Sequence, residues 1–329
     1  NVLSGPIERG TGLLKQIREG VTFSYDKVRH GLCMMLWGYF LKLLIANRLA
    51  FIVDPAFSNL DDQTGLVMVI VAIAYGIQLY ADFAGYSCLA IGMAETFGFT
   101  LMPNFRQPYF ARDIRDFWSR WHISLSTWLR DYIYIPLGGN RKGKARQCIN
   151  LFITFLISGL WHGTGWQFIV WGGIHGVYQI ASKLTSDLRV RIAEKSRVKT
   201  GCTSFRIFKA VITFIFVDIA WIFFRAGSVH DALSIGKKIV CYPFFWQALE
   251  NNWYMMDLDE KRFFILILEL LIVLAVDILH EKKISITAWL NEQNKAFRWL
   301  VYLGAVCILV LGVIRDYGIE ASSFIYARF

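Results

Sequence analysis

The sequence predicts an all-α, polytopic membrane protein: a bundle of spanning helices with one broken, re-entrant segment and with further helices at the membrane interface. Three observations lead to this fold class. Hydrophobic residues make up 55% of the chain, and its mean hydropathy of +0.42 exceeds that of ordinary globular domains. Apolar runs long enough to cross a hydrocarbon core of about 30 Å recur along the sequence. The charged residues gather between those runs.

Five apolar runs are each predicted to form a spanning α-helix. They cover residues 28–53, 66–92, 207–225, 263–279 and 298–314. Helices are expected because a chain in lipid must satisfy its backbone N–H and C=O groups within the segment. No internal repeat or flexible linker divides the chain, so residues 1–329 are expected to form a single membrane domain. The chain opens at Asn1 without a signal peptide, and we expect it to be a fragment that lacks N-terminal spans.

The charges indicate a membrane orientation rather than a nucleic-acid partner. A net charge of +10 would suit phosphate binding, but the bases are confined to particular loops. Loop 54–65 has three acids and no base, whereas 100–148 has nine bases and three acids, and 182–209 has eight bases and two acids. This is the positive-inside pattern. It places both basic loops and 280–297 in the cytoplasm, and it places 226–262 and the C-terminus outside.

Residues 78–180 hold the polar groups that are expected to form the catalytic core. The first of them is Asp82, which lies within the apolar run 66–92. An ionisable side chain in a span is costly and is by default a functional-site hypothesis. A structural hydrogen bond between helices explains Asp82 equally well, so both interpretations stay open.

A helix rich in tryptophan and arginine is predicted over Ala111–Ile135. Its apolar residues recur at helical spacing, and Pro136 stops it. It carries these aromatic and basic side chains: Trp118, Trp121, Trp128, Arg112, Arg115, Arg120 and Arg130. Such a composition is typical of a helix that lies at the membrane interface or dips into it.

The region 149–181 is predicted to break inside the membrane. Its first apolar run, Ile149–Leu160, has about 12 residues, fewer than the roughly 20 that a span needs. The glycines between 159 and 165 allow the main chain to turn tightly. Irregular backbone at that depth is tolerated only where protein or a water-filled cavity covers it. His162 falls in this break and is expected to line a cavity.

Position separates the six histidines of the chain. Three are expected to be packing or surface residues: His30, His230 and His280. His175 follows Trp171 by one helical turn and is flanked by glycines, so a structural hydrogen bond is expected there. His122 and His162 each follow a tryptophan, and their neighbours indicate one shared pocket.

The sequence argues against two other kinds of site for these histidines, a zinc site and a Ser-His-Asp hydrolase. Neither His122 nor His162 has a second His, Cys or acid at the short helical spacing usual for zinc sites, so no metal site is expected. A Ser-His-Asp hydrolase would need a nucleophile elbow such as G-x-S-x-G, and the sequence lacks it. A histidine base would therefore need an incoming nucleophile.

Nine segments carry a resemblance to a known family: 4–9, 82–87, 104–109, 117–126, 128–132, 134–140, 159–163, 171–176 and 324–326. They resemble the membrane-bound O-acyltransferase family, specifically its bacterial alginate O-acetyltransferase-like branch, which is related to the D-alanyl transfer protein of teichoic acid synthesis. The similarity covers the whole chain. One departure is Cys88, where the branch often has an acid that would give a second carboxylate near Asp82.

The resemblance implies a curved bundle of many helices with a tunnel joining the two membrane faces, and early helices that would precede Asn1. It implies that His162 is the active-site histidine and that His122 takes the second polar position. It also implies that an acetyl group crosses the membrane to a hydroxyl of an extracytoplasmic polysaccharide, through a partner acetyltransferase. The expected location is the inner, cytoplasmic membrane, as a multi-pass protein.

No bound cofactor is expected, because the donor, acetyl-CoA or an acyl-carrier thioester, is already activated. We expect His162 to act as general base and His122 to orient or polarise the acyl carbonyl, with an acyl-histidine relay as the variant. The residues expected to line the channel are Trp118, Trp121 and Trp161. The residues expected to attract CoA phosphates or an acidic carrier protein are Arg112, Arg115, Arg120 and Arg130. Positive-inside topology alone also explains these arginines.

Three other functions stay open at this stage. D-alanyl transfer from a carrier protein to teichoic acid would use the same basic face. An ion or solute transporter would use the intramembrane carboxylates Asp82, Asp218 and Asp277. A structural scaffold for an envelope complex explains the hydrophobicity, but it does not explain a pair of histidines at a glycine-rich break.

Overall fold

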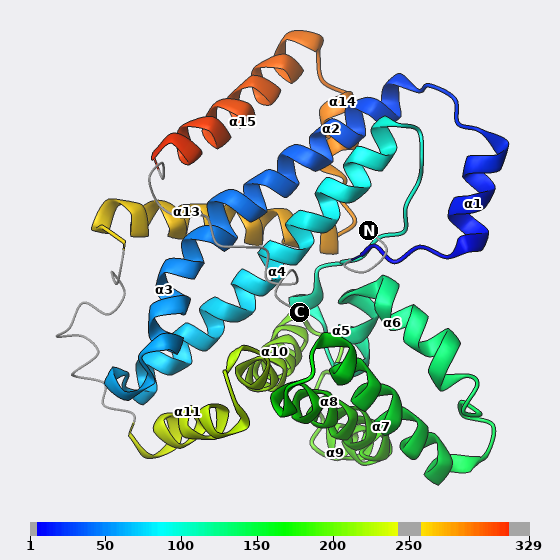
Figure 1. The fold of residues 1–329 in the computed structure, drawn as a ribbon, viewed down its shortest axis with the longest axis vertical. Helices are drawn as coiled ribbons and strands as arrows, with labels where there is room; N and C mark the ends of the chain where they lie inside the picture. Colours follow the sequence, from blue (N-terminus) through cyan, green and yellow to red (C-terminus); the bar gives the residue numbers. More distant parts are fainter. Residues whose placement is uncertain (1–4, 243–257, 316–329) are drawn as a thin grey trace. The chain divides into compact units, whose positions relative to one another are not determined.

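The computed structural model describes residues 5–242 and 258–315, and this part of the chain is helical, with no β-strand (Figure 1). The all-α prediction is confirmed. Five helices are long and apolar enough to cross a membrane: Tyr25–Ser58, Gly65–Thr96, Thr203–Arg225, Glu260–Glu281 and Lys295–Arg315. They contain the five predicted runs, so the prediction of a polytopic membrane bundle is also confirmed.

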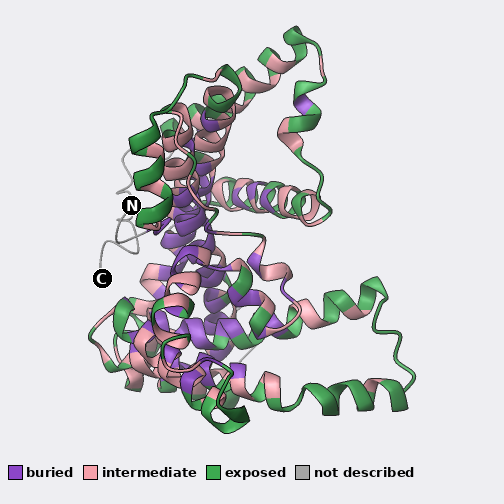
Figure 2. Ribbon diagram, turned by 90° about the vertical axis from the view of Figure 1, so that its right-hand side faces the viewer, coloured by how far each residue is buried: buried purple, intermediate pink, exposed green. Residues whose placement is uncertain are grey.

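The chain divides into two compact units. Among the described residues, the first unit comprises 5–58, 74–104 and 258–315, and the second comprises 59–73 and 105–242. Each unit has its own buried residues, at which the ribbon is purple in Figure 2. The single domain over 1–329, with 78–180 as its catalytic core, stays a prediction.

The first unit contains these helices: α1 (Gly10–Glu19), α2 (Tyr25–Tyr39), the π-helical η1 (Phe40–Ala46), α3 (Asn47–Ser58), most of α4 (Gly65–Thr96), α13 (Glu260–Glu281), α14 (Ile286–Asn291) and α15 (Lys295–Arg315). Helices α2 and α4 lie side by side and meet at glycines (Figure 1). A methyl group at Gly31 would lie 2.5 Å from the carbonyl oxygen of Gly92, and one at Gly38 would lie 2.7 Å from that of Gly85. Small residues therefore set the close approach of these two helices, as is common in membranes.

Ion pairs and a hydrogen bond between side chains join the helices of the first unit. Arg48 is 1% exposed and pairs with Glu269 of α13. Lys42 Nζ lies 2.5 Å from Asp82 Oδ1, so Asp82 is tied to a neighbouring helix. Tyr80 donates a hydrogen bond to Asp277 across 3.2 Å. Such contacts are needed because an ionisable side chain is costly within a membrane bundle unless it is paired.

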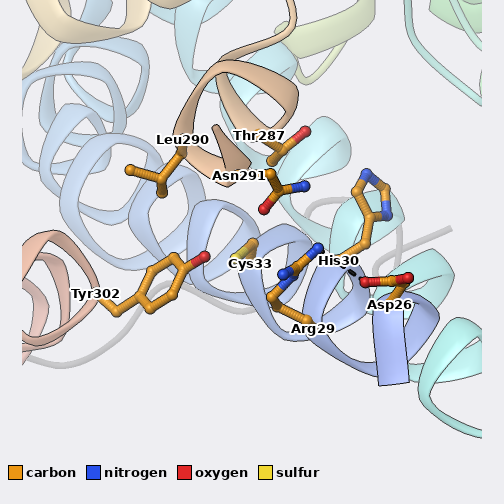
Figure 3. A pocket seen from close by; sticks show the side chains of 8 residues that line it. All are labelled: Asp26, Arg29, His30, Cys33, Thr287, Leu290, Asn291 and Tyr302. Atoms are coloured by element: carbon orange, nitrogen blue, oxygen red, sulfur yellow. Dashed lines mark hydrogen bonds and ion pairs between the residues drawn. The ribbon is translucent and has the colours of Figure 1, made fainter. Parts of the chain in front are cut away.

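The ends of several helices of the first unit meet around a polar pocket of about 330 Å³ (Figure 3). Its lining comes from α2, α14 and α15: Asp26, Arg29, His30, Cys33, Thr287, Leu290, Asn291 and Tyr302. Arg29 pairs with Asp26 at 2.9 Å, and His30 contacts Glu95 near the end of α4 at 2.6 Å. The start of α2, the end of α4 and the segment 280–297 thus share one face of this unit, as the predicted topology requires.

The second unit is built from the remaining helices: η2 (Leu60–Asp62), η3 (Pro108–Phe110), α5 (Ile114–Arg120), α6 (Ile123–Leu129), the π-helical η4 (Arg130–Tyr134), α7 (Gly143–His162), α8 (Trp166–Leu184), α9 (Ser186–Lys195), α10 (Thr203–Arg225) and α11 (Val229–Cys241). Among the described elements of this unit, the most extensive contact is between α7 and α8, which form a hairpin (Figure 1). Gly159 faces the carbonyl group of Phe168, and Gly172 faces that of Phe155, too closely for any side chain at either position.

The predicted break in 149–181 is confirmed at Gly163–Gly165, between α7 and α8. Helix α7 begins at Gly143 and has 20 residues, because the polar residues that precede Ile149 also adopt the helical conformation. Charged side chains such as Lys144 have good helix propensity, so the helix starts before the apolar run does.

The prediction of a single helix over Ala111–Ile135 is wrong, because the segment is broken at Trp121 and His122. Helices α5 and α6 flank the break, and η4 follows α6. His122 has φ +43°, in the left-handed region. A residue there cannot continue a right-handed helix, even though the apolar residues on both sides keep a helical period.

Candidate active site

The structure brings His122 and His162 together in the second unit. Their ring centroids lie 6.5 Å apart, with the planes at 73°. The two residues are 2% and 3% exposed. His162 is the last residue of α7, and His122 directly precedes α6. Two segments 40 residues apart in the sequence thus place their imidazoles in one buried site.

The backbone at His122 turns so that the two helices on either side can diverge. Trp121 N–H still bonds to Phe117 O at 2.9 Å, and Ser126 N–H bonds to His122 O at 2.9 Å. His122 is therefore the hinge between two hydrogen-bonded helices. The left-handed conformation costs a non-glycine residue roughly 1–2 kcal/mol, and strain of this kind is concentrated at functional sites.

A backbone hydrogen bond defines the proton position on the His162 ring. Nδ1 of His162 lies 2.6 Å from the carbonyl oxygen of Ser158. A carbonyl oxygen can only accept, so Nδ1 carries the hydrogen and donates it. In the neutral imidazole, Nε2 then has the lone pair that a general base needs.

Aromatic rings from two helices hold His162 in place. Trp171 of α8 contacts it edge-on, with centroids 4.9 Å apart, and Phe224 of α10 does so at 5.5 Å. Trp171 and Phe224 themselves lie 5.0 Å apart. These rings surround the imidazole with apolar surface. Sequence reasoning missed Phe224, because this residue lies in an apolar run without a motif, 62 residues after His162.

His175 lies one turn after Trp171 on α8. It forms the structural hydrogen bond that was expected of it. It is fully buried, and Trp118 Nε1 donates to its Nδ1 across 3.3 Å. The two ring planes are nearly perpendicular, at 86°. With Nδ1 accepting, the neutral ring carries its hydrogen on Nε2, and this nitrogen has no hydrogen-bond partner among the described residues. His175 thus orients Trp118.

The three tryptophans expected to line a channel fall into two groups. Trp118 and Trp121 are buried and belong to one aromatic cluster, in which Trp121 lies 5.0 Å from Trp221 of α10. Trp161 is 42% exposed and packs on Trp128 at 5.8 Å. Only Trp118 and Trp121 therefore belong to the buried cluster around the histidines.

The arginines of the same segment differ in their surroundings. Arg120 Nε donates to Asp116 at 2.7 Å, within α5. Arg130 pairs with the neighbouring Asp131 at 2.8 Å and remains largely exposed. Arg115 is exposed, whereas Arg112 lines a groove with α8, α9 and α10. Of the predicted basic face, Arg115 and Arg130 are the exposed members.

The carboxylates named for a transporter are distributed over both units. Asp82 and Asp277 belong to the first unit, where Lys42 and Tyr80 engage them. Asp218 lies in α10 of the second unit and is 8% exposed. In the described part of the chain, no cluster of three or more His, Cys, Asp or Glu side chains could hold a metal ion.

Comparison with known proteins gives a family and a set of relatives. The model of "MBOAT, membrane-bound O-acyltransferase family" matches residues 2–220. This match includes both histidines of the site.

Three relatives illustrate the range of similar proteins. A "Probable alginate O-acetylase" of Pseudomonas syringae is 40% identical over 77% of this chain and 46% of its own length. A "Peptidoglycan O-acetyltransferase" of Helicobacter pylori is 30% identical over 100% of this chain and 62% of its own length. A "Teichoic acid D-alanyltransferase" of Bacillus subtilis is 29% identical over 70% of this chain and 59% of its own length. The chain spans about half the length of the alginate relatives.

Proposed function

The chain belongs to the membrane-bound O-acyltransferase family, and on this premise we propose that it is an O-acyltransferase in which His162 is the general base. The observation that carries the proposal is the hydrogen bond from His162 Nδ1 to the Ser158 carbonyl. It leaves Nε2 as the basic nitrogen, beside a second buried imidazole. A paired arrangement of this kind suits acyl transfer better than transport or a structural role.

The proposed reaction proceeds in two stages. Nε2 of His162 accepts the proton of an acceptor hydroxyl while that oxygen attacks the thioester carbonyl and forms a tetrahedral oxyanion. The C–S bond then breaks, the ester is released, and the thiol leaves with the proton returned by His162. His122 donates a hydrogen bond to the acyl oxygen and stabilises the charge as it develops.

The names of the relatives support a choice of acyl group and acceptor. The relatives at 40% and 30% identity are named for O-acetylation of alginate and of peptidoglycan. We therefore propose an acetyl group, donated by a cytosolic thioester such as acetyl-CoA and accepted by a hydroxyl of an extracytoplasmic polysaccharide through a partner acetyltransferase. The host membrane is the cytoplasmic, inner membrane. The groove residue Arg112 precedes α5, and the exposed Arg115 lies in its first turn. Both belong to the basic region 100–148, which the charge pattern places in the cytoplasm, on the side of the donor.

The test compares His162→Ala with His230→Ala in membranes that contain the full-length protein. His230 is a suitable control because its side chain is exposed and lies outside the site. Labelled acetyl-CoA should give acetylated product with His230→Ala and none with His162→Ala, at equal protein level. Unchanged transfer by His162→Ala would refute the proposed base.

A D-alanyl donor is the second candidate, and the Bacillus subtilis relative is the observation in its favour. The same membranes can be offered a labelled D-alanyl carrier protein in place of acetyl-CoA. Turnover of the D-alanyl thioester alone would change the donor and keep His162 as base. Solute uptake in proteoliposomes without turnover of either thioester would contradict the acyltransferase proposal itself.

A further inference from the structure

A groove of about 890 Å³ lies in the second unit, apart from the histidine pair. It is formed by the end of α8, by α9 and by the first half of α10. The lining residues that matter for its chemistry are of two kinds, basic and apolar. The basic ones are Arg112, Arg189, Arg206 and Lys209.

The charge of the groove is strongly one-sided. Four basic side chains line it, against one acid, Asp113. The Asp113 carboxylate accepts a hydrogen bond from the backbone N–H of Asp116 at 2.9 Å and thereby caps the N-terminus of α5. Neither Arg206 nor Lys209 has an ion-pair partner among the described residues. The groove therefore offers a site for an anion.

The apolar part of the lining runs along α10. Phe208, Ile212 and Phe216 follow one another at a spacing of four residues, so they share one helix face. They are 59%, 38% and 45% exposed. This helix, Thr203–Arg225, is one of the candidate membrane spans. In a membrane span, this exposed apolar face would border on the hydrocarbon of the bilayer, next along the helix to Arg206 and Lys209.

A ligand for this groove must combine an anionic group with a long apolar part. We propose that the groove binds an anionic phospholipid, with its phosphate at Arg206 and Lys209 and an acyl chain along Phe208, Ile212 and Phe216. Charge complementarity selects the headgroup, because basic pockets between membrane helices on the cytoplasmic side attract anionic lipids. The exposed apolar residues that the groove shares with the candidate span α10 favour a lipid over a water-soluble phosphate.

The test uses the full-length protein in nanodiscs of phosphatidylcholine with increasing phosphatidylglycerol, and native mass spectrometry to count the lipids that stay bound. The groove variant is Arg206→Gln/Lys209→Gln. The matched control is Lys144→Gln/Arg146→Gln, which removes the same charge from exposed positions of α7 that do not line the groove. Each lost base near a charged surface should weaken binding roughly fivefold, so the groove variant should lose about thirtyfold. The control should match the wild type.

Two results would overturn the proposal. Equal losses in the groove variant and the control would show diffuse attraction to surface charge, and displacement of the lipid by acetyl-CoA would show that the groove holds the donor. A photoactivatable phosphatidylglycerol on the wild-type protein gives an independent readout that needs no variant to fold. Its adducts should map to residues 205–216, and adducts found only elsewhere would contradict the assignment.

Discussion

His162 bonds through Nδ1 to the backbone carbonyl of Ser158, and the Ser158 hydroxyl has no hydrogen-bond partner in the described structure. The Ser158 side chain should therefore not be needed to hold His162 or for acyl transfer. We predict that Ser158→Ala keeps kcat/KM for acyl transfer within about twofold, because the bond that holds the tautomer survives. Removing a buried hydroxyl without a partner should leave the free energy of unfolding unchanged or raise it slightly.

Thr154 is the matched control, one helical turn earlier on α7. Its hydroxyl does form a hydrogen bond, to the carbonyl of Asn150 at 2.7 Å. Thr154→Val should therefore lower the free energy of unfolding by about 1 kcal/mol, which Ser158→Ala should not. A large loss of acyl transfer in Ser158→Ala would show that the hydroxyl, rather than the carbonyl, acts on His162.

The second prediction separates the backbone of His122 from its imidazole. His122→Gly should be more stable than His122→Ala, because glycine adopts a φ of +43° without strain and both variants lack the buried imidazole. It should still lower kcat by about 100- to 1000-fold, the usual cost of losing one donor to a developing oxyanion. Thermal unfolding and acyl-transfer kinetics measure the two effects on one sample.

His122→Ala is the comparison for this experiment, since it also lacks the imidazole but keeps the strain. It should match His122→Gly in kcat and unfold at a lower temperature. If His122→Gly retained full kcat, the oxyanion role of His122 would be refuted, whatever its effect on stability.

The pairing of His122 with His162 could be anticipated from the sequence, but the geometry that makes it useful could not. Each histidine follows a tryptophan, and one falls at a glycine-rich break, so their type and neighbourhood were visible. The left-handed turn at His122 was hidden, because the apolar period on either side continues as if through one helix. The spacing of apolar residues predicts which face of a helix is buried, but it does not reveal a single residue with a positive φ.

The third prediction concerns the α7–α8 hairpin, which holds His162. Gly172 faces the carbonyl of Phe155 with no room for a methyl group, whereas a methyl at the adjacent Gly173 would lie 3.7 Å from Leu156, an ordinary contact. Gly172→Ala should therefore destabilise the protein by about 1–3 kcal/mol through overpacking. Gly173→Ala should be neutral or stabilising, since alanine is the better helix former.

Both variants can be followed by thermal unfolding in detergent and by the yield of monodisperse protein. A smaller loss for Gly172→Ala than for Gly173→Ala would contradict the close helix contact. The two glycines are adjacent in the sequence, and only the structure distinguishes them, because contact with the partner helix depends on which side of α8 each one faces.

The fourth prediction tests the hydrogen bond between Trp118 and His175. Trp118→Phe keeps an aromatic ring but removes the N–H that His175 Nδ1 accepts, which leaves a buried nitrogen without a partner. The expected loss of stability is about 1–3 kcal/mol. Trp161→Phe is the control, since Trp161 is 42% exposed, and it should cost little. Equal losses of stability in the two variants would show that the cost comes from the smaller ring and not from the lost hydrogen bond.

Asp82 is a second feature whose role could not be decided from the sequence. An acid in an apolar run signals either function or a structural bond, and the position of its partner decides between the two. The partner, Lys42, lies 40 residues earlier on η1, a helix that reads as a plain apolar span apart from this one base. The structure thus shows a structural ion pair for Asp82, while its expected role in substrate binding stays a prediction.

The last prediction concerns the buried pair of Arg48 and Glu269, which links η1–α3 to α13. Arg48→Met should destabilise the protein by about 3–5 kcal/mol, because it removes one charge of a buried ion pair and leaves the Glu269 carboxylate less compensated, with the Arg315 guanidinium 3.9 Å away. The double variant Arg48→Met/Glu269→Met removes both charges and should recover most of that loss. Thermal unfolding of the two single variants and the double variant measures the coupling. If the losses of the single variants simply added in the double variant, the two side chains would not be acting as a pair, and the stability of this helix contact would have to come from apolar packing.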